Sequence, residues 1–468
     1  MKTRPVLTTL LTSLCLAAVG PRAQALNPPP DGCYPAFTTA EGCDALNLLT
    51  TGAGNTGLGW RSLFSDSTGS FNTGVGAGTL VLNNADSNTA VGTAALLLNT
   101  AGTQNTTVGT AALVFNDDGN FNTANGAFAL FNHTTGDHNT AVGTQALFSD
   151  TEGHANTAIG FQALYSNTTI GGGTGAFNTA TGLQALFSNN TGSDNTANGV
   201  TALANNTTGN DNTAIGFQAL LSNATGDANT ATGFRALPSN TTGVANTAHG
   251  DGALFLNTTG TGNIALGFNA GHDLTTGDAN IDIGNPGVAA ESNNIRIGVQ
   301  GTQMATFIAG ISGTAVTGTA VVVNGSGQLG VAPSSDRFKD EIKRMDKASE
   351  AILALKPVTF YYKNDIDPNC IPQFGLVAEE VEKVNPDLVV RDKEGKPYTV
   401  RYDQVNAMLL NEFLKEHNAF VEEQKKVQRL EAALAIVNQQ LREQEAKIEK
   451  VSAQIQTSKS ELQVVRVP

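Results

Sequence analysis

A short repeat dominates the sequence and limits the folds that the chain can adopt. An Asn, followed in most copies by Thr, recurs fourteen times; eleven of the thirteen spacings are seventeen residues, one is sixteen and one is twenty-two. A Gly lies four residues after each of these Asn residues, and a Leu lies eight residues after the first twelve. A fixed period of this length is typical of a solenoid, whose stacked copies bury one continuous core. The copies begin at Asn55, Asn72, Asn88, Asn105, Asn122, Asn139, Asn156, Asn178, Asn195, Asn212, Asn229, Asn246, Asn263 and Asn280.

The composition of each copy favours β structure over helix. A typical copy reads Asn-Thr-Ala-Ile-Gly-Phe-Gln-Ala-Leu from Asn212 to Leu220, followed by a polar turn to Gly226. Gly, Asn and Thr have low helix propensity, and one short apolar patch cannot form a core alone. We therefore expect a mostly β repeat fibre, either a parallel β-roll or a trimeric β-prism. The repeated Asn side chains are expected to form a hydrogen-bonded ladder along the stack.

The repeat kernel is similar to a motif of known surface proteins. Asn-Thr-Ala-Ile-Gly resembles the Asn-Ser-Val-Ala-Ile-Gly kernel of trimeric autotransporter adhesin heads, whose repeat is shorter than the one found here. The resemblance concerns the type of fold more than descent, and it implies a fibre that stands on a surface and adheres.

The charge distribution argues against two classes of partner. The net charge is −14, and residues 26–330 contain only three basic side chains, Arg61, Arg235 and Arg296. Nucleic acids and anionic membranes are bound largely through Lys and Arg contacts to phosphate groups. We therefore expect no nucleic-acid partner and no binding to an anionic membrane surface, and we attribute the acidity to the solubility of a long fibre. We also expect no membrane span, because no stretch beyond the N-terminal one is apolar enough to cross a bilayer.

The N-terminus has the features of a secretory signal. Lys2 and Arg4 precede an apolar stretch at 6–19, and Ala23-Gln24-Ala25 fits a small-x-small cleavage site. Secretion places the mature chain in an oxidising compartment, where Cys33 and Cys43 are expected to form a disulfide. The remaining mature cysteine, Cys370, is expected to be a buried thiol.

The composition changes abruptly at residue 333, where charged residues become frequent and Gly becomes rare. Before this point the repeat decays, and Asn324-Gly325 predicts a tight hairpin. After it, the pattern predicts a helix at 342–355, strands at 358–362 and 373–377, and a short helix at 379–384. We divide the chain into a signal peptide (1–25), an N-terminal segment (26–50), the repeat shaft (51–290), a β collar (291–332), a small α+β domain (333–412) and a coiled coil (413–468).

The coiled coil is predicted from heptads that continue for more than six repeats. The mixture of Leu, Ile and Val at both seam positions is compatible with three strands, and the polar Gln444 and Ser458 are expected to fix the register. The first seam contains Phe413, Phe420, Val427, Leu434, Leu441, Ile448, Ile455 and Leu462; the second contains Leu430, Val437, Gln444, Val451, Ser458 and Val465.

Three stretches of the α+β domain resemble the peptidase S74 family, the endosialidase-type intramolecular chaperone domain. Ser-Ser-Asp-Arg-Phe-Lys at 334–339 is similar to the family's opening Ser-Asp-x-x-x-Lys. Phe-Gly-Leu-Val-Ala-Glu-Glu-Val at 374–381 is similar to its Gly-Leu-Ile-Ala-Gln-Glu-Val core, and Val-Arg-Tyr-Asp at 400–403 resembles its closing stretch. The resemblance implies a homotrimer that folds with the help of this domain and then cuts it off.

The same resemblance implies a Ser/Lys dyad for self-cleavage. The two family residues lie five positions apart, and Ser334 and Lys339 have this spacing. A neutral lysine amine can take the proton of the serine hydroxyl and so activate it as a nucleophile. Ser335, however, occupies the family's Asp position. Shifting the register by one residue would match Ser335-Asp336 to the family's Ser-Asp and make Ser335 the alternative nucleophile, with Lys339 only four residues away. A domain that assembles the fibre without cutting it is the other reading of these residues.

Other chemistry finds little support. We expect no cofactor and no metal site, and five of the six His residues (His133, His138, His154, His249 and His272) are expected in surface turns. The sequence therefore predicts a secreted or cell-surface, adhesin-like trimeric fibre, whose receptor would be a surface glycan or a protein. The alternative is a glycan-acting enzyme of the tailspike type, but the repeat region leaves no room for an inserted catalytic domain with clustered carboxylates.

Overall fold

The structure is a computed structural model that describes residues 35–168, 174–309, 317–392 and 394–463. It divides into two units, which are considered separately. The first contains the repeats and ends near residue 317, with residues 325–327 added to it. The second contains residues 318–324 and the chain from 328 onward. The predicted signal peptide and Cys33 lie outside the described residues, whereas Cys43 is exposed in the first described turns.

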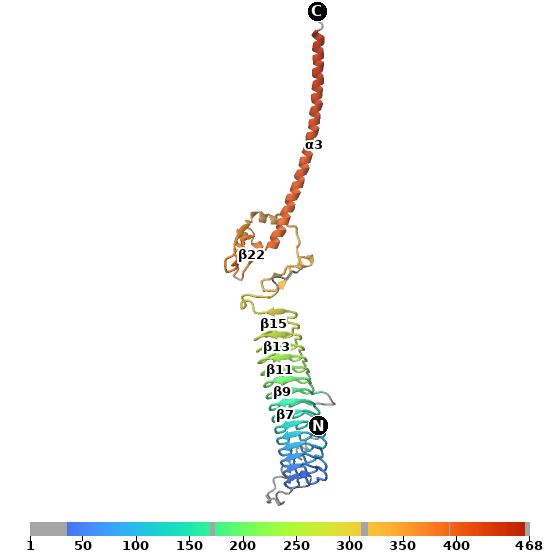
Figure 1. Cartoon of the computed structure of the whole chain (residues 1–468). Helices are drawn as coiled ribbons and strands as arrows, with labels where there is room; N and C mark the ends of the chain where they lie inside the picture. Colours follow the sequence, from blue (N-terminus) through green and yellow to red (C-terminus); the bar gives the residue numbers. More distant parts are fainter. Residues whose placement is uncertain (1–34, 169–173, 310–316, 393, 464–468) are drawn as a thin grey trace, which may run out of the picture. The chain divides into compact units, whose positions relative to one another are not determined.

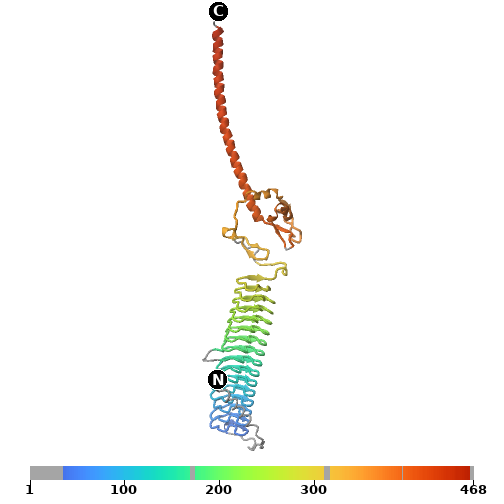
Figure 2. The same ribbon diagram turned by 180° about the vertical axis from the view of Figure 1, so that it is seen from behind.

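The first unit is a parallel β-solenoid with one sheet of sixteen strands, stacked in sequence order (Figures 1 and 2). The prediction of a parallel β repeat is confirmed, and the strands pair within a single chain. After a short 3-10 helix, η1 (Pro35–Phe37), the strands are β1 (Thr39–Glu41), β2 (Thr56–Leu58), β3 (Thr73–Val75), β4 (Thr89–Val91), β5 (Thr106–Val108), β6 (Thr123–Asn125), β7 (Thr140–Val142), β8 (Thr157–Ile159), β9 (Thr179–Thr181), β10 (Thr196–Asn198), β11 (Thr213–Ile215), β12 (Thr230–Thr232), β13 (Thr247–His249), β14 (Ile264–Leu266), β15 (Ile281–Ile283) and β16 (Ile295–Ile297).

Strand register follows the repeat without slipping. Thr213 pairs with Thr230 and Ala214 with Ala231, so each position of one copy lies over the same position of the next. The single long spacing does not disturb this order, because β8 and β9 pair Thr157 with Thr179 in the same register. The strand register is therefore independent of the length of this copy.

The invariant Gly is explained by backbone conformation and by the close approach of successive turns. Gly109 has φ +137°, which L side chains rarely adopt, and a Cβ built on it would lie 2.6 Å from the carbonyl oxygen of Gly126. A side chain here would push neighbouring turns apart. The same geometry recurs at the corners that follow β1 to β13, from Gly42 to Gly250.

The core consists of columns of Ala and Leu. The central strand residue, such as Ala214, is buried, as are Ala219 and Leu220 later in the same turn. Each buried Leu contributes about 1.5–3 kcal/mol relative to an exposed one. This burial offsets the cost of the left-handed backbone at Leu220, where φ is 51°. The repeated Leu of the sequence is thus the continuous core of the solenoid.

The predicted Asn ladder is confirmed. The backbone amide and the side-chain amide of Asn229 both donate to Oδ1 of Asn212, at 3.0 and 3.1 Å. The same side-chain amide also donates to the carbonyl oxygen of Gly243 at 2.8 Å. Asn229 is completely buried, and buried amides of this kind must be hydrogen-bonded to be tolerated. The ladder therefore satisfies the polar groups at one edge of the core.

A second buried ladder was not predicted. It lies eleven residues after the first Asn in each turn, where Asn223 donates to Asn206 at 2.9 Å and Asn240 donates to Asn223 at 2.8 Å. Asn223 also donates to the carbonyl oxygen of Gly226, three residues later, at 2.9 Å. The Asn of the repeated Asn-x-Thr-Gly sequence is therefore a core residue that closes its own turn.

His133 contradicts the expectation that the histidines lie in surface turns. It replaces an Asn of the second ladder and is completely buried beside Asp150. Its Nδ1 lies 2.7 Å from Asp150 Oδ2, and its Nε2 lies 2.7 Å from the carbonyl oxygen of Gly136. The carbonyl can only accept, so Nε2 carries a proton, and a second proton lies between Nδ1 and the carboxylate. The pair is therefore neutral as a whole, which is what burial requires.

Buried carboxylates also lie near both ends of the solenoid. Burial raises the pKa of Asp66 to about 6, although the amides of Gly69 and Asn72 donate to it. Burial likewise raises the pKa of Asp282 to about 6. Among the described residues neither oxygen of Asp282 has a hydrogen-bond partner, and the nearby Arg296 is instead paired with Glu291. Asp282 occupies a position that Ala fills in the preceding turns.

The second unit begins with a hairpin and is mainly small elements followed by one long helix. The predicted Asn324-Gly325 hairpin is confirmed, since β17 (Val322–Val323) and β18 (Leu329–Gly330) pair antiparallel. The elements that follow are the 3-10 helices η2 (Asp336–Phe338) and η3 (Asp346–Ala354), β19 (Val358–Phe360), β20 (Gln373–Gly375), α2 (Ala378–Val384), the 3-10 helix η4 (Pro386–Leu388), β21 (Val389–Arg391), β22 (Pro397–Val400) and α3 (Tyr402–Gln463).

Two expectations for this unit were wrong in detail. The helix predicted at 342–355 is the shorter 3-10 helix η3, because the residues before Asp346 are irregular. Cys370 is exposed rather than buried, and its thiol contacts the side chain of Asn364. Both differences follow from a domain that buries few residues within one chain.

Candidate functional site: the domain before the long helix

A small apolar cluster holds the second unit together. Val381 of α2, Leu388 of η4 and Val400 of β22 are buried around Met408 of α3. The base of α3 is therefore part of the domain, because the side chain of Met408 completes the core formed by the shorter elements.

Two of the three sequence stretches that indicated a chaperone domain lie in contact. Tyr402, at the start of α3, accepts a hydrogen bond at its hydroxyl from the backbone amide of Leu376, at 3.0 Å. The backbone amide of Arg401 donates to the carbonyl oxygen of Leu388 at 2.8 Å. The 374–381 and 400–403 stretches therefore act as a structural joint between the domain and its helix.

The candidate dyad lies apart from this core. Ser334, Ser335 and Lys339 are all exposed, on either side of the short helix η2. Ser335 donates to Asp336 at 3.3 Å, and no described hydrogen bond joins Lys339 to either serine. The single chain therefore presents the three residues without assembling them into a catalytic pair. A base that activates Ser334 or Ser335 would have to be brought into place by further packing.

A buried polar cluster that the sequence did not reveal connects η3 to α3. Ser349 is completely buried and donates to the carboxylate of Glu412. It accepts from the side-chain amide of Asn411 at 2.7 Å and from the Lys415 amine at 3.4 Å. Lys415 is also paired with Glu412 at 2.6 Å. The only signal for it in the sequence is the charged pair three residues apart on the helix, which is common on helix surfaces.

This cluster places a serine beside a lysine, but its electrostatics fit a structural role. The hydrogen bond and charge of Glu412 raise the pKa of Lys415, which keeps the amine protonated. Hydrogen bonds from Lys415 and Ser349 lower the pKa of Glu412, which makes it a weaker base. Neither neighbour can therefore take the hydroxyl proton of Ser349 efficiently. The cluster fixes η3 against α3 instead.

The unit leaves a large apolar surface uncovered. Phe374 is 83% exposed and Tyr398 is 74% exposed, in a domain whose own core holds only five buried apolar side chains. Exposed aromatic residues at this density are typical of a surface that another chain covers. Ile342, Leu353, Tyr361 and Ile366 are similarly exposed.

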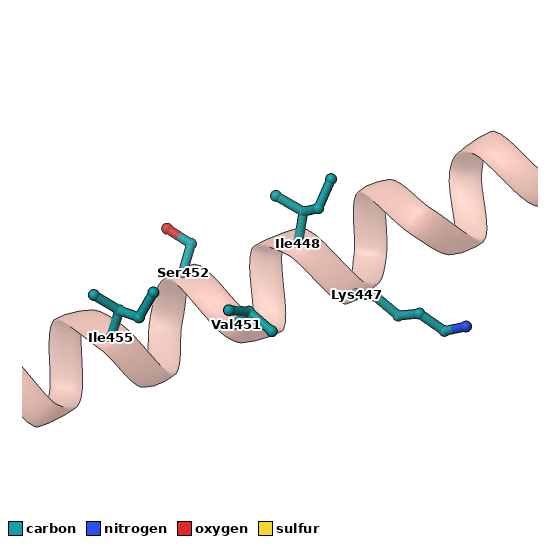
Figure 3. A pocket seen from close by; sticks show the side chains of 5 residues that line it. All are labelled: Lys447, Ile448, Val451, Ser452 and Ile455. Atoms are coloured by element: carbon teal, nitrogen blue, oxygen red, sulfur yellow. The ribbon is translucent and has the colours of Figure 1, made fainter.

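The helix α3 continues this pattern beyond the domain. Ile448 and Ile455, one heptad apart, project from the same side of the helix, and Val451 lies between them (Figure 3). All three are more than half exposed. Seven further seam residues are exposed along the same helix, namely Phe413, Phe420, Val427, Leu430, Leu434, Val437 and Leu441.

Neither a membrane span nor a metal centre emerges from the described residues. None of the helices in the described ranges is both long and apolar enough to cross a bilayer. Within the same ranges, no group of three or more His, Cys, Asp and Glu side chains is arranged to hold a metal ion.

Comparison with known proteins finds a family match within the second unit. Residues 334–390 match the model of the Peptidase_S74 family, described as chaperone of endosialidase. The match begins at the candidate nucleophile Ser334 and includes η2, η3, β19, β20, α2 and η4. No curated protein matches the chain.

Proposed function

From the match to the chaperone of endosialidase, we propose that this chain is a secreted, adhesin-like structural fibre that assembles as a homotrimer. The β-solenoid and the chaperone domain together fit a structural protein of the tail-fibre type. The shaft would extend outward and meet a glycan or protein receptor. The second unit would bring three chains together, and the signal-like N-terminus supports secretion.

The exposed seam of α3 is the observation that carries the trimer. A helix from Tyr402 to Gln463 with apolar residues at heptad spacing is stable in water only when partners cover the seam. Three parallel copies would bury the seam residues against one another and bring three copies of the chaperone domain together. Their exposed aromatic residues, including Phe374, would then be covered.

Self-cleavage is the second part of the proposal. Assembly would bury Lys339 beside Ser334 and favour the neutral amine. Ser334 Oγ would bond to the carbonyl carbon of Pro333, and the peptide bond between the two residues would break. Lys339 would take the hydroxyl proton and pass it to the released amine, and water would hydrolyse the ester. A carbonyl of a neighbouring chain is the alternative target. The shaft would then be kinetically trapped without its folding aid.

A denaturing gel and an intact-mass measurement on the full chain test the cleavage. The expected result is a C-terminal fragment that begins at Ser334 and ends at Pro468. Ser334→Ala and Lys339→Ala should abolish it, whereas Ser335→Ala should not. Loss of the fragment in Ser335→Ala but not in Ser334→Ala would show that Ser335 is the nucleophile. A single full-length band from the unmodified chain would show that the domain assembles the fibre without cutting it.

A further inference from the structure

One side of the solenoid carries no charge through eleven consecutive turns. The side is formed by three columns, which lie one, three and five residues after the first Asn of each turn from Asn55 to Asn229. None of these 33 positions holds Asp, Glu, Lys or Arg. The first column is Thr in every turn, and the other two are mostly β-branched or aromatic residues. We call this the charge-free side.

The acidic residues of the same turns lie elsewhere. All ten Asp and Glu residues between positions 55 and 244 fall eleven or more residues after the first Asn of their turn, for example Asp211 and Asp227. Asp is depleted in strands and favoured in turns, which accounts for part of this separation. The resulting side also has the pattern of a protein interface, whose centre is depleted of charged residues.

The charge-free side also exposes large apolar residues in consecutive turns. Phe217 is 42% exposed, Phe234 is 51% exposed, and their rings stack at 5.2 Å. Ile159, Phe161, Leu183, Val200 and Ile215 are exposed to a similar degree. A contiguous apolar surface that spans several turns exceeds the scattered apolar residues of an ordinary protein surface.

A second apolar column follows the corner Gly of each turn. Nine residues after the first Asn, the rings of Phe131, Phe148, Tyr165 and Phe187 stack in order, with centroids 5.1 to 5.2 Å apart. These rings are only half-buried. The turns therefore carry this second apolar surface in addition to the charge-free side. Two unlike surfaces on one subunit suit a ring in which each copy contacts both of its neighbours.

The repeat itself specifies the partner. A partner that contacts turn after turn must advance by the same distance per turn, and parallel strands are about 4.8 Å apart. Other copies of this chain have this rise, and the heptads of α3 would hold them parallel and in register. Neighbouring copies thus present like positions at the same height.

We propose that the charge-free side is the surface through which the shafts of the fibre pack against one another, with the corner Gly column facing the centre. The inference rests on the proposed trimer and extends it from the C-terminal helix to the shaft. The charged turns would then face outward and form the surface that is available to a receptor.

A crosslinking experiment on the full chain tests the inference. Phe217→Cys and the control Thr225→Cys, which is exposed in the charged turn of the same copy, are prepared in a background that carries Cys33→Ser, Cys43→Ser and Cys370→Ser. A short bis-maleimide should link chains at least tenfold more in Phe217→Cys than in the control. Equal linking, or no linking from Phe217→Cys in a chain that light scattering shows to be a trimer, would overturn the inference and leave the proposed trimer intact. A monomer would overturn both.

A charge substitution gives a second readout. Phe217→Asp with Phe234→Asp should lower the melting temperature of the assembled shaft, because carboxylates would be buried between the copies. Thr208→Asp with Thr225→Asp, in the charged turns, should leave it unchanged. Equal melting temperatures for the two pairs would show that the charge-free side faces water.

Discussion

The solenoid and the second unit differ in how they bury their apolar and polar groups. In the solenoid, each turn buries Ala and Leu columns and satisfies its buried amides through the turns above and below. In the chaperone unit, a small cluster around Val381 is buried, while Phe374 and the seam of α3 are exposed. The first unit satisfies its core groups within one chain, whereas the second leaves apolar side chains that the proposed trimer would cover.

This difference suggests a division of labour. A stack of turns can begin at any copy and can slip by one period, because all copies are alike. In the proposed trimer, the heptads of α3 and the exposed surface of the domain would favour one register between the copies. We infer that the second unit supplies the register that the repeat lacks, and that the shaft then supplies the stability.

The largest predicted effect is in the first Asn ladder. Asn229→Ala should destabilise the solenoid by on the order of 5 kcal/mol, since it removes four hydrogen bonds inside the core and leaves the backbone amide of Asn246 without an acceptor. Amide hydrogen exchange should show the loss around β12. The control Asn205→Ala removes an exposed Asn side chain and should change little. Equal protection in the two variants would mean that the ladder contributes nothing.

A somewhat smaller effect is predicted for the buried pair in the second ladder. His133→Ala should cost about 3–5 kcal/mol, because Asp150 would remain buried without its partner. The matched control is the double variant His133→Asn with Asp150→Asn, which extends the Asn ladder on both sides and should melt close to the unmodified chain. A double variant as unstable as the single one would show that the pair has a role that amides cannot fill.

The smallest predicted effect concerns pH. The pKa of Asp282 is raised to about 6 from 3.8, so the folded chain takes up a proton in the range where the unfolded chain does not. Stability should therefore rise as the pH falls from about 7 to about 4. Asp282→Asn should add on the order of 1–3 kcal/mol at pH 7 and flatten this slope. Burial also raises the pKa of Asp66, so part of the pH dependence of stability should remain in the Asp282→Asn variant. If Asp282→Asn and the unmodified chain had the same slope of melting temperature against pH, the assignment to Asp282 would be contradicted.

The repeat made the solenoid predictable from the sequence. The roles of residues that depart from the repeat could not be predicted in this way. The ladder through Asn229 follows from its strict spacing, and the corner Gly follows from its invariance. The second ladder was missed because an Asn before Thr and Gly also fits a surface turn. His133 was misplaced because its burial depends on Asp150 in the next turn, which only the register reveals. The cluster around Ser349 joins residues more than 60 positions apart, and no local pattern indicates it.

The candidate dyad of Ser334 and Lys339 shows a different limit of prediction from the sequence. Ser334 and Lys339 were proposed from spacing and family resemblance, and the single chain holds both in solvent. Under the proposed mechanism, their chemistry would depend on surfaces that assembly creates. The sequence can therefore nominate these residues, whereas the surroundings that would activate them would come from several chains.

Light scattering of the full chain tests the central claim most directly. The account predicts a particle with the mass of three chains. Leu434→Lys with Leu441→Lys, which places charges in the exposed seam of α3, should convert it to monomers or misregistered aggregates. Glu422→Lys with Glu443→Lys, which changes charges on the same helix away from the two seams, should leave the mass at three chains. A monodisperse monomer from the unmodified chain, with its heptad seam exposed to water, would contradict the account.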